Sequence, residues 1–238
     1  MSPKRISKRI AGCFLLALLL AGTPLAAQEK SYLAAGKPDA VALLPSPPTP
    51  DTKEYAADLA AVQRVFKART QEEEKRATKD SGLSVFIFAR AIGPFLQPGK
   101  FPETEALYLH VKGSLEGTIT PSKEHWKRAR PYLVDTNLAL GAPEKSYSYP
   151  SGHSVRGTVY ALVLAEVFPE KREAILRVGE EIGWERVVIG KHFPSDIYAG
   201  RVVGKAIFRE LMASPDFQKD LACAKAEARA ALSRAGVK

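Results

Sequence analysis

The chain has 238 residues and a formal net charge of +9, which is long enough for one domain with a substantial core. Its cationic residues are spread along the sequence rather than gathered in blocks, so the charge does not require a nucleic-acid partner, although it would attract small anions. The sequence contains no Cys/His metal cluster, no Walker loop and no dinucleotide-binding fingerprint, which excludes the common classes of metal, nucleotide and dinucleotide site that such patterns mark.

Residues 1–27 have the three parts of a secretory signal peptide, namely a basic start, an apolar stretch from 13 to 21, and small residues before Gln28. The apolar stretch is too short to span about 30 Å of hydrocarbon. We therefore expect cleavage near Ala27 and a periplasmic or secreted mature chain without a membrane span. Cleavage removes four positive charges and no acid, which lowers the net charge from +9 to +5, and leaves Cys223 as the one cysteine. An intrachain disulfide is thereby excluded.

The first half of the mature chain predicts several helices after an extended segment. Residues 28–51 form a proline-rich lead-in in which regular structure is disfavoured. Three- and four-residue spacing of apolar residues predicts a helix over 52–78, with the charged stretch 71–79 as its solvated end. Residues 83–92 are expected to form a buried helix, with a strand as the second choice. Two more helices are predicted, from 102 to about 117 and from Thr120-Pro121 to Arg130, where Pro131 ends the second.

The second half predicts longer helices after one irregular segment. Residues 132–149 lack periodicity and are expected to form a loop. Helices are expected over 152–168, 169–188 and 194–212, and from 215 onward. Because there is no internal repeat and no alternating strand pattern, the sequence predicts an all-α fold with one helical domain over 52–238.

Three separated clusters carry side chains suited to holding and transferring a phosphoryl group. They are Lys123 with Arg130-Pro131, the tetrapeptide 150–153 (Pro-Ser-Gly-His), and Arg186 with His192 and Asp196. A transferring phosphoryl group spreads negative charge over three oxygens, which guanidinium and ammonium groups can bind. Lys123 and Arg130 are seven residues apart, so on one helix both would face the same cleft.

The other two clusters would supply backbone donors and imidazoles. The amides of 150–153 precede a helix and would face an anion, with Gly152 allowing close approach and Ser151 donating its hydroxyl. A carboxylate at Asp196 can accept from one ring nitrogen of His192 and leave the other free to attack phosphorus. Taken singly, each cluster also fits a simpler interpretation: a Ser-Gly helix cap, a hydrogen bond at a helix end, or a solvated arginine. The spacing alone leaves open which histidine attacks.

Together the clusters resemble the phosphatase signature of the type 2 phosphatidic acid phosphatase superfamily, which also includes vanadium haloperoxidases. All three parts occur in order with the internal spacings of that signature. The flanks Ser148-Tyr149, 161–166 and 199–204 resemble those of the bacterial class A nonspecific acid phosphatases. The similarity is strongest from Lys123 onward. One position departs from the family, which usually has Ser where this chain has Glu185, and the effect on phosphate binding stays open at this point.

The resemblance implies an acid phosphatase in a helical bundle that acts on small phosphate monoesters with broad specificity and transfers phosphate to alcohols. By it, His192 is the nucleophile that forms a phosphohistidine, Asp196 orients it, and His153 protonates the leaving alcohol. It also implies that the phosphoryl oxygens are held by Lys123, Arg130, Ser151, Gly152 and Arg186. Neither a metal nor another cofactor is expected, and the pH optimum should lie below neutrality. Members are often homo-oligomers, and the sequence does not fix a subunit number.

Three alternatives use the same cations. Lipid phosphate and undecaprenyl pyrophosphate phosphatases are usually polytopic membrane proteins, and the absence of apolar spans after residue 27 argues against them. Vanadium haloperoxidases are typically much longer. A periplasmic phosphate-binding protein would have no use for a nucleophilic histidine beside an aspartate. We therefore favour the phosphatase.

Overall fold

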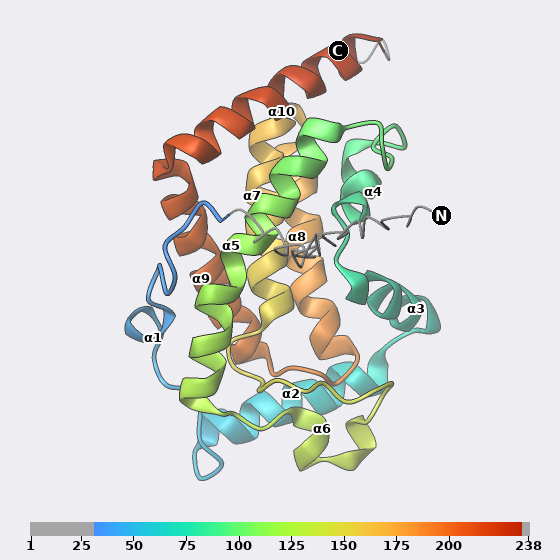
Figure 1. Cartoon of the computed structure of the whole chain (residues 1–238). Helices are drawn as coiled ribbons and strands as arrows, with labels where there is room; N and C mark the ends of the chain where they lie inside the picture. Colours follow the sequence, from blue (N-terminus) through green and yellow to red (C-terminus); the bar gives the residue numbers. More distant parts are fainter. Residues whose placement is uncertain (1–30, 235–238) are drawn as a thin grey trace, which may run out of the picture.

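The computed structural model describes residues 31–234, and these residues form helices and loops with no strand. Figure 1 shows α7, α8 and α9 side by side, with α5 lying against them and α10 crossing one end. The predicted all-α class is confirmed, whereas the predicted signal peptide lies outside the described residues. The helices are α1 Ala40–Leu43, α2 Lys53–Ala68, α3 Gln71–Lys79, α4 Ala89–Ile92, α5 Pro102–Trp126, α6 Pro131–Val134, α7 Gly152–Val167, α8 Arg172–Val188, α9 Pro194–Ala213 and α10 Pro215–Arg234, with 3-10 turns at Asp80–Gly82, Val85–Phe88, Thr136–Leu138 and Pro169–Lys171.

Helix α7 is the central helix and is buried along most of its length. It approaches α8 closely where two glycines face each other: a Cβ on Gly157 would lie 2.7 Å from the carbonyl oxygen of Gly179. On its other side, a Cβ on Gly200 of α9 would lie 2.7 Å from the carbonyl oxygen of Ser151. These backbone contacts fix the start of α7 against the start of α9 and the body of α8, and so place the second and third sequence clusters together.

Helix α5 corrects two predictions. It runs unbroken through Pro121, where the sequence predicts a new helix, and it ends at Trp126 because Lys127 adopts a left-handed conformation with φ of 46°. Pro121 lies on the exposed face of the helix, where water can satisfy the carbonyl that proline leaves without a donor. The buried neighbours Leu115 and Ile119 hold the continuous helix against the core. Lys123 and Arg130 are therefore not on one helix.

Other boundaries also differ from the prediction. The charged stretch Gln71–Lys79 is a separate helix, because Thr70 and Glu73 form a capping box that starts a new helix after a bend at Arg69. The segment after Gly82 is helical as expected, as a 3-10 turn followed by α4. The expected loop after Arg130 begins with α6 and a 3-10 turn, and the lead-in contains the short helix α1.

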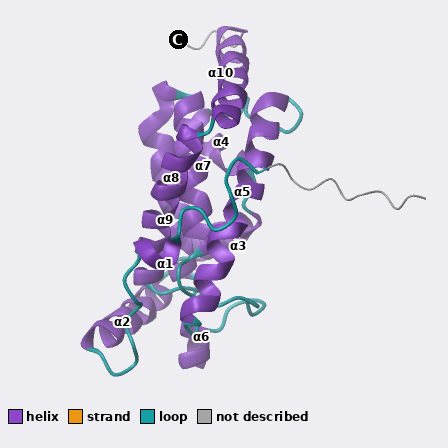
Figure 2. Ribbon diagram, turned by 60° about the vertical axis from the view of Figure 1, so that its left-hand side comes forward, coloured by secondary structure: helices purple, strands orange, loops and turns teal. Residues whose placement is uncertain are grey.

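The described part of the lead-in, which starts at residue 31, runs beside α5, as Figure 2 shows. The backbone nitrogen of Tyr32 donates to Ser114 at 2.9 Å, and the hydroxyl of Thr118 donates to the carbonyl of Lys37 at 2.9 Å. Both partners are residues of α5, so the proline-rich segment is part of the packed structure. Over residues 31–234, none of the helices combines the length and the apolar character that a bilayer crossing requires.

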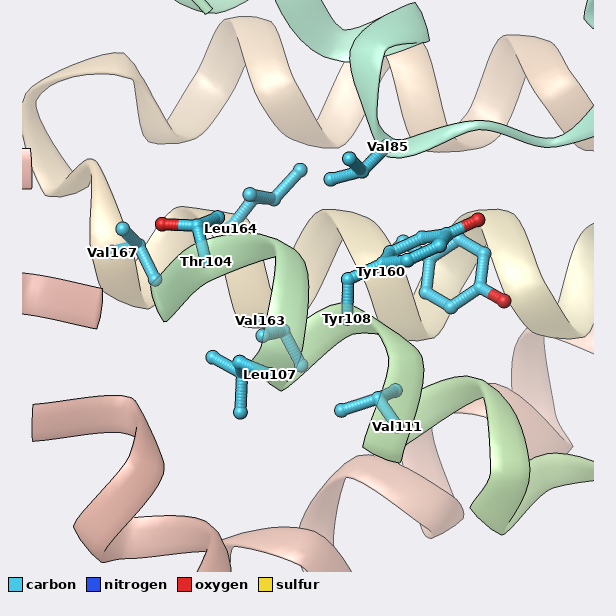
Figure 3. Close-up of a pocket in the computed structure, with 9 residues that line it drawn as sticks. All are labelled: Val85, Thr104, Leu107, Tyr108, Val111, Tyr160, Val163, Leu164 and Val167. Carbon is cyan, nitrogen blue, oxygen red and sulfur yellow. The ribbon is translucent and has the colours of Figure 1, made fainter. Parts of the chain in front are cut away.

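The interior between α5 and α7 is densely packed. Figure 3 shows the side chains that meet there, with the tilted rings of Tyr108 and Tyr160 beside Val85. The two tyrosine rings lie 4.5 Å apart, and the space left between the side chains is about 10 Å³. A volume of this size holds at most about one water molecule. This apolar gap is therefore too small to be a substrate site.

Candidate active site

A polar cavity of about 210 Å³ opens where α5, the loop before α7, the first turn of α7 and the loop before α9 meet. It brings together five residues that the sequence predicts to act on a phosphoryl group. The lining residues are Glu116, Ile119, Thr120, Lys123, Arg130, Glu144, Ser146, Gly152, His153, Arg156 and His192. Asp196, Arg186 and Ser151, which complete the predicted set, lie behind this lining.

His192 is held with one ring nitrogen toward Asp196 and the other toward Arg130. Its Nδ1 lies 3.2 Å from Oδ2 of Asp196, and its Nε2 lies 3.1 Å from Nη1 of Arg130. A carboxylate can only accept a hydrogen bond, so Nδ1 carries the proton and Nε2 keeps its lone pair. Burial, and then the charge of Arg130, lower the pKa of His192 well below its usual value. The ring is therefore neutral, with Nε2 available as a nucleophile.

Asp196 is fixed as an anion by donors on several sides. The hydroxyl of Ser148 donates at 2.5 Å, the amide of Phe193 at 2.9 Å, and Nη1 of Arg128 at 2.6 Å. Burial would raise the pKa of Asp196, but the hydrogen bond from His192 and the charge of Arg128 outweigh burial and hold the pKa well below its usual range. Asp196 thus keeps the His192 ring in one orientation and one tautomer.

Lys123 and Arg130 reach the cavity from different segments and share the loop at 146–148 as a support. Lys123 Nζ donates to the carbonyl of Tyr147 at 2.5 Å. Arg130 donates from Nε to the carbonyl of Ser146 at 2.8 Å and from Nη1 to that of Lys191 at 3.1 Å. Burial, and then the charge of Arg130, lower the pKa of Lys123 to about 7. An anion bound between Lys123 and Arg130 would raise the pKa of Lys123 again, because its negative charge favours the protonated amine.

The first turn of α7 contributes Gly152 and His153 to the cavity lining. The hydroxyl of Ser151 accepts from the amide of Ser154 at 3.3 Å and so caps the helix behind the cavity lining, whereas Gly152 is at the cavity surface. Nε2 of His153 lies 3.2 Å from the carbonyl of Ser81, which requires the proton on that nitrogen. Burial, and then the charge of Arg186, lower the pKa of His153 to about 3.

Arg186 and Glu185 are neighbours on α8 with different surroundings. Arg186 is buried, and its Nη2 donates to the carbonyl of Ala77 while its charge acts on His153 and Arg130. Glu185 accepts from Nε of Arg76 at 3.0 Å and does not line the cavity. Burial, followed by the nearby charge of Asp80, raises the pKa of Glu185. Its carboxylate therefore points toward α3 and not toward the predicted phosphate position.

The structure adds residues for which the sequence gives little signal. Arg128 joins Asp196 to Asp58, whose Oδ2 accepts from its Nη2 at 2.8 Å. In the sequence, Arg128 is one charge in a basic run, and only the fold brings Asp58 to it. Arg156 and Glu116 line the cavity and form an ion pair with each other. Arg156 follows Gly152 by four residues, which places both on one face of α7, and this spacing is a signal that sequence reasoning could have used.

Metal ligands are a separate question. Within residues 31–234, no group of three or more His, Cys, Asp or Glu side chains is arranged to hold a metal ion. The charged groups that face the cavity are mainly the cations Lys123, Arg130 and Arg156, with Glu144 and Glu116 as acids. The donor set of this cavity suits an anion.

Comparison with known proteins identifies the family of this chain. The PAP2 superfamily model matches residues 106–219. A non-specific acid phosphatase of Salmonella typhimurium is 36% identical over 77% of this chain and 78% of that protein, and one of Providencia stuartii is 33% identical over 79% and 80%. A lipid A 1-phosphatase of Rhizobium johnstonii is 35% identical over 32% of this chain and 34% of that protein. The chain therefore belongs to the PAP2 superfamily and, within it, to the class A bacterial non-specific acid phosphatases.

Proposed function

We propose that this chain is an exported, metal-independent acid phosphatase that hydrolyses small phosphate monoesters through a phosphohistidine at His192. The family assignment makes it a phosphatase. The observation that carries the proposed mechanism is the His192 ring, whose Nδ1 is tied to Asp196 and whose Nε2 faces a cavity lined by cations. A phosphate-binding protein would need the cations but not a nucleophile held in this way.

In the first step, the Nε2 lone pair of His192 attacks phosphorus and the bond from phosphorus to the ester oxygen breaks. His153 gives its proton to the departing alcohol. Asp196 stabilises the positive charge that the His192 ring acquires. Lys123, Arg130 and Arg186 offset the charge on the phosphoryl oxygens, with the Gly152 amide as an additional donor.

In the second step, water attacks the phosphohistidine, the P–N bond breaks, and His153 takes the proton of that water. Phosphate leaves and the neutral His192 is restored. An alcohol in place of water would receive the phosphoryl group, which gives phosphotransferase activity. The cations of the cavity supply the charge that a metal ion provides in other phosphatases, so we expect chelators to leave the rate unchanged.

The acidic pH optimum follows from the two imidazoles. His192 must be neutral, and burial keeps its pKa low enough for this in mild acid. His153 must be protonated, and its pKa of about 3 without ligand means that acid increases the reactive fraction. A bound phosphate dianion would raise the pKa of His153 by opposing the charge of Arg186. The specificity constant kcat/KM should therefore rise as the pH falls from neutrality.

A second candidate function is removal of phosphate from a lipid, because part of the chain is similar to lipid A 1-phosphatases. Comparing kcat/KM for p-nitrophenyl phosphate with that for a phosphorylated lipid in detergent micelles separates the two. Vanadium-dependent haloperoxidase activity is the third, and bromide oxidation with added vanadate measures it.

The test is hydrolysis of p-nitrophenyl phosphate from pH 4 to pH 9, with and without EDTA, by the wild type and by His192→Ala. We expect activity in acid, no effect of EDTA, and loss of turnover in the variant. Rapid quench into alkaline SDS after mixing with a ³²P-labelled monoester should trap an acid-labile, base-stable phosphoprotein in the wild type alone. Turnover by His192→Ala near the wild-type rate would refute the mechanism. A wild type that binds phosphate without any turnover would instead indicate a binding protein.

A further inference from the structure

Arg156 lines the cavity together with Lys123 and Arg130, and it is the cation of this lining that the proposed mechanism does not use. It lies one helical turn along α7 from Gly152, and its Nη1 is 2.8 Å from the position that a Cβ on Gly152 would occupy. It lines the same cavity as His153 and His192. Its charge acts on both His153 and Lys123 and lowers their pKa values. Arg156 thus shares the cavity with His153, the residue that the proposed mechanism makes the proton donor to the leaving group.

The partner of Arg156 is Glu116 on α5. Nη2 of Arg156 donates to Oε1 of Glu116, and Glu116 precedes Lys123 by seven residues, so both acid and lysine face the cavity. Among the described residues, Nη1 of Arg156 has no hydrogen bond. The side chain of Glu116 is 53% exposed, whereas that of Arg156 is 22% exposed. An ion pair with so exposed a carboxylate contributes little to stability, so Glu116 can exchange for another anion at low cost.

We propose that Arg156 makes this enzyme selective for substrates whose leaving group is, or carries, a second phosphate, with diphosphates, which are phosphoric anhydrides, as the simplest case. This inference rests on the proposed function, because it assigns the leaving-group side of the same cavity. The attacked phosphoryl group would lie between Lys123 and Arg130 at Nε2 of His192, with the buried Arg186 behind the lining. The second phosphate would contact the guanidinium of Arg156, one helical turn along α7 from Gly152. The carboxylate of Glu116 occupies that position when no substrate is bound.

The chemistry of the step is unchanged. Nε2 of His192 bonds to the attacked phosphorus, the bond to the bridging oxygen breaks, and His153 protonates that oxygen. The leaving group is then a monophosphate, whose negative charge Arg156 stabilises. Because the charge on the leaving oxygen grows as the bond breaks, this contact acts on turnover as well as on binding.

The experiment compares kcat/KM for inorganic pyrophosphate and for phenyl phosphate in buffers without divalent cations. A charge-assisted hydrogen bond contributes enough for the ratio of the two constants to fall by about 10- to 100-fold in Arg156→Met. Glu116→Gln, which removes the competing carboxylate, should raise the ratio. Arg172→Met is the matched control, because Arg172 is an exposed arginine at the start of α8 outside this cavity, and its ratio should equal that of the wild type.

A second variant and a second measurement keep the test independent of folding and of turnover. Arg156→Lys keeps the charge but not the planar fork, so its ratio should lie between those of the wild type and Arg156→Met. Calorimetric binding of pyrophosphate and orthophosphate to His192→Ala, with and without Arg156→Met, should show a loss confined to pyrophosphate. Equal losses on both ligands, or no loss, would overturn the assignment. If the wild type does not hydrolyse phenyl phosphate but Arg156→Met still loses pyrophosphate binding, the proposed function is refuted and only the role of Arg156 in binding the second phosphate remains.

Discussion

Arg128 should be among the most sensitive positions in the protein, although it does not line the cavity. Its guanidinium is buried between two carboxylates, with Nη1 2.6 Å from Oδ1 of Asp196 and Nη2 2.8 Å from Oδ2 of Asp58. It also donates to the hydroxyl of Ser195 at 2.7 Å and stacks over the ring of Phe193 at 4.0 Å. Substitution of Arg128 by Met keeps most of the apolar contact and removes the charge.

The expected loss of stability follows from the two buried carboxylates that the substitution leaves without a partner. Removing one partner of a buried ion pair costs about 3–5 kcal/mol, because the other charge is left without compensation. Here two buried carboxylates lose the same partner, so we expect a value near the upper end of that range. This is a large part of the roughly 5–15 kcal/mol that stabilises an ordinary domain. Loss of the Arg128 charge should also raise the pKa of Asp196, which weakens its hold on His192 in acid.

Urea unfolding, monitored by tryptophan fluorescence, measures the free energy of unfolding, because Trp126 and Trp184 are both partly buried. Arg128→Met should lower the unfolding free energy by about 5 kcal/mol, and adding Asp58→Asn should recover part of that loss, because one unpaired charge disappears. Arg172→Met, which removes an exposed arginine, should change stability by less than about 0.5 kcal/mol. A loss below about 1 kcal/mol in Arg128→Met, or losses that simply add in the double variant, would show that the network does not act as argued.

Three further predictions concern charge and pH. Folding lowers the pKa values of His192 and His153, so the unfolded chain binds more protons than the folded chain below about pH 6.5. Urea titrations should therefore show that the unfolding free energy decreases as the pH falls from about 6.5 toward 3. The variant His192→Gln should show a weaker dependence on pH. Glu144 lines the cavity with its Oε2 4.0 Å from Nη2 of Arg130, so Glu144→Gln should tighten orthophosphate inhibition by about 2- to 5-fold at low salt and less at 0.5 M NaCl, as inhibition kinetics would show. Glu185→Gln should reduce stability less than Glu185→Ala in urea unfolding, because the amide still accepts from the guanidinium of Arg76.

The parts of the fold that depend on local signals could be predicted from the sequence. The helix starts at Gly152 and Pro194 follow from turn residues that punctuate apolar segments. The separate helix at Gln71–Lys79 could also have been predicted, because Thr70 and Glu73 have the spacing of a capping box. The course of α5 through Pro121 could not, because it depends on which face of the helix is buried in the finished fold.

The same division holds for the site. His192 and Asp196 are four residues apart, and the structure joins them as that spacing predicts. The contact between Arg128 and Asp58 spans 70 residues, and nothing local to either residue indicates it. Lys123 and Arg130 do meet at one cavity, but through the loop that both contact and not through a shared helix face. The sequence thus indicates residues that line one cavity, whereas the contacts that support them are set by tertiary packing, and their role in phosphoryl transfer stays a proposal.

The position of Glu185 shows why a departure from the family pattern need not act on the phosphate. Successive residues of an α-helix point about 100° apart, so Arg186 and Glu185 face different neighbours. Arg186 donates to the carbonyl of Ala77, and Glu185 accepts from Arg76 of the same helix, α3. The segment that follows α3 supplies the carbonyl of Ser81 to His153. Glu185 therefore connects α8 to the segment that contacts both Arg186 and His153, and so supports one wall of the site. Its charge also acts on the neighbouring Arg186, but its carboxylate does not line the cavity.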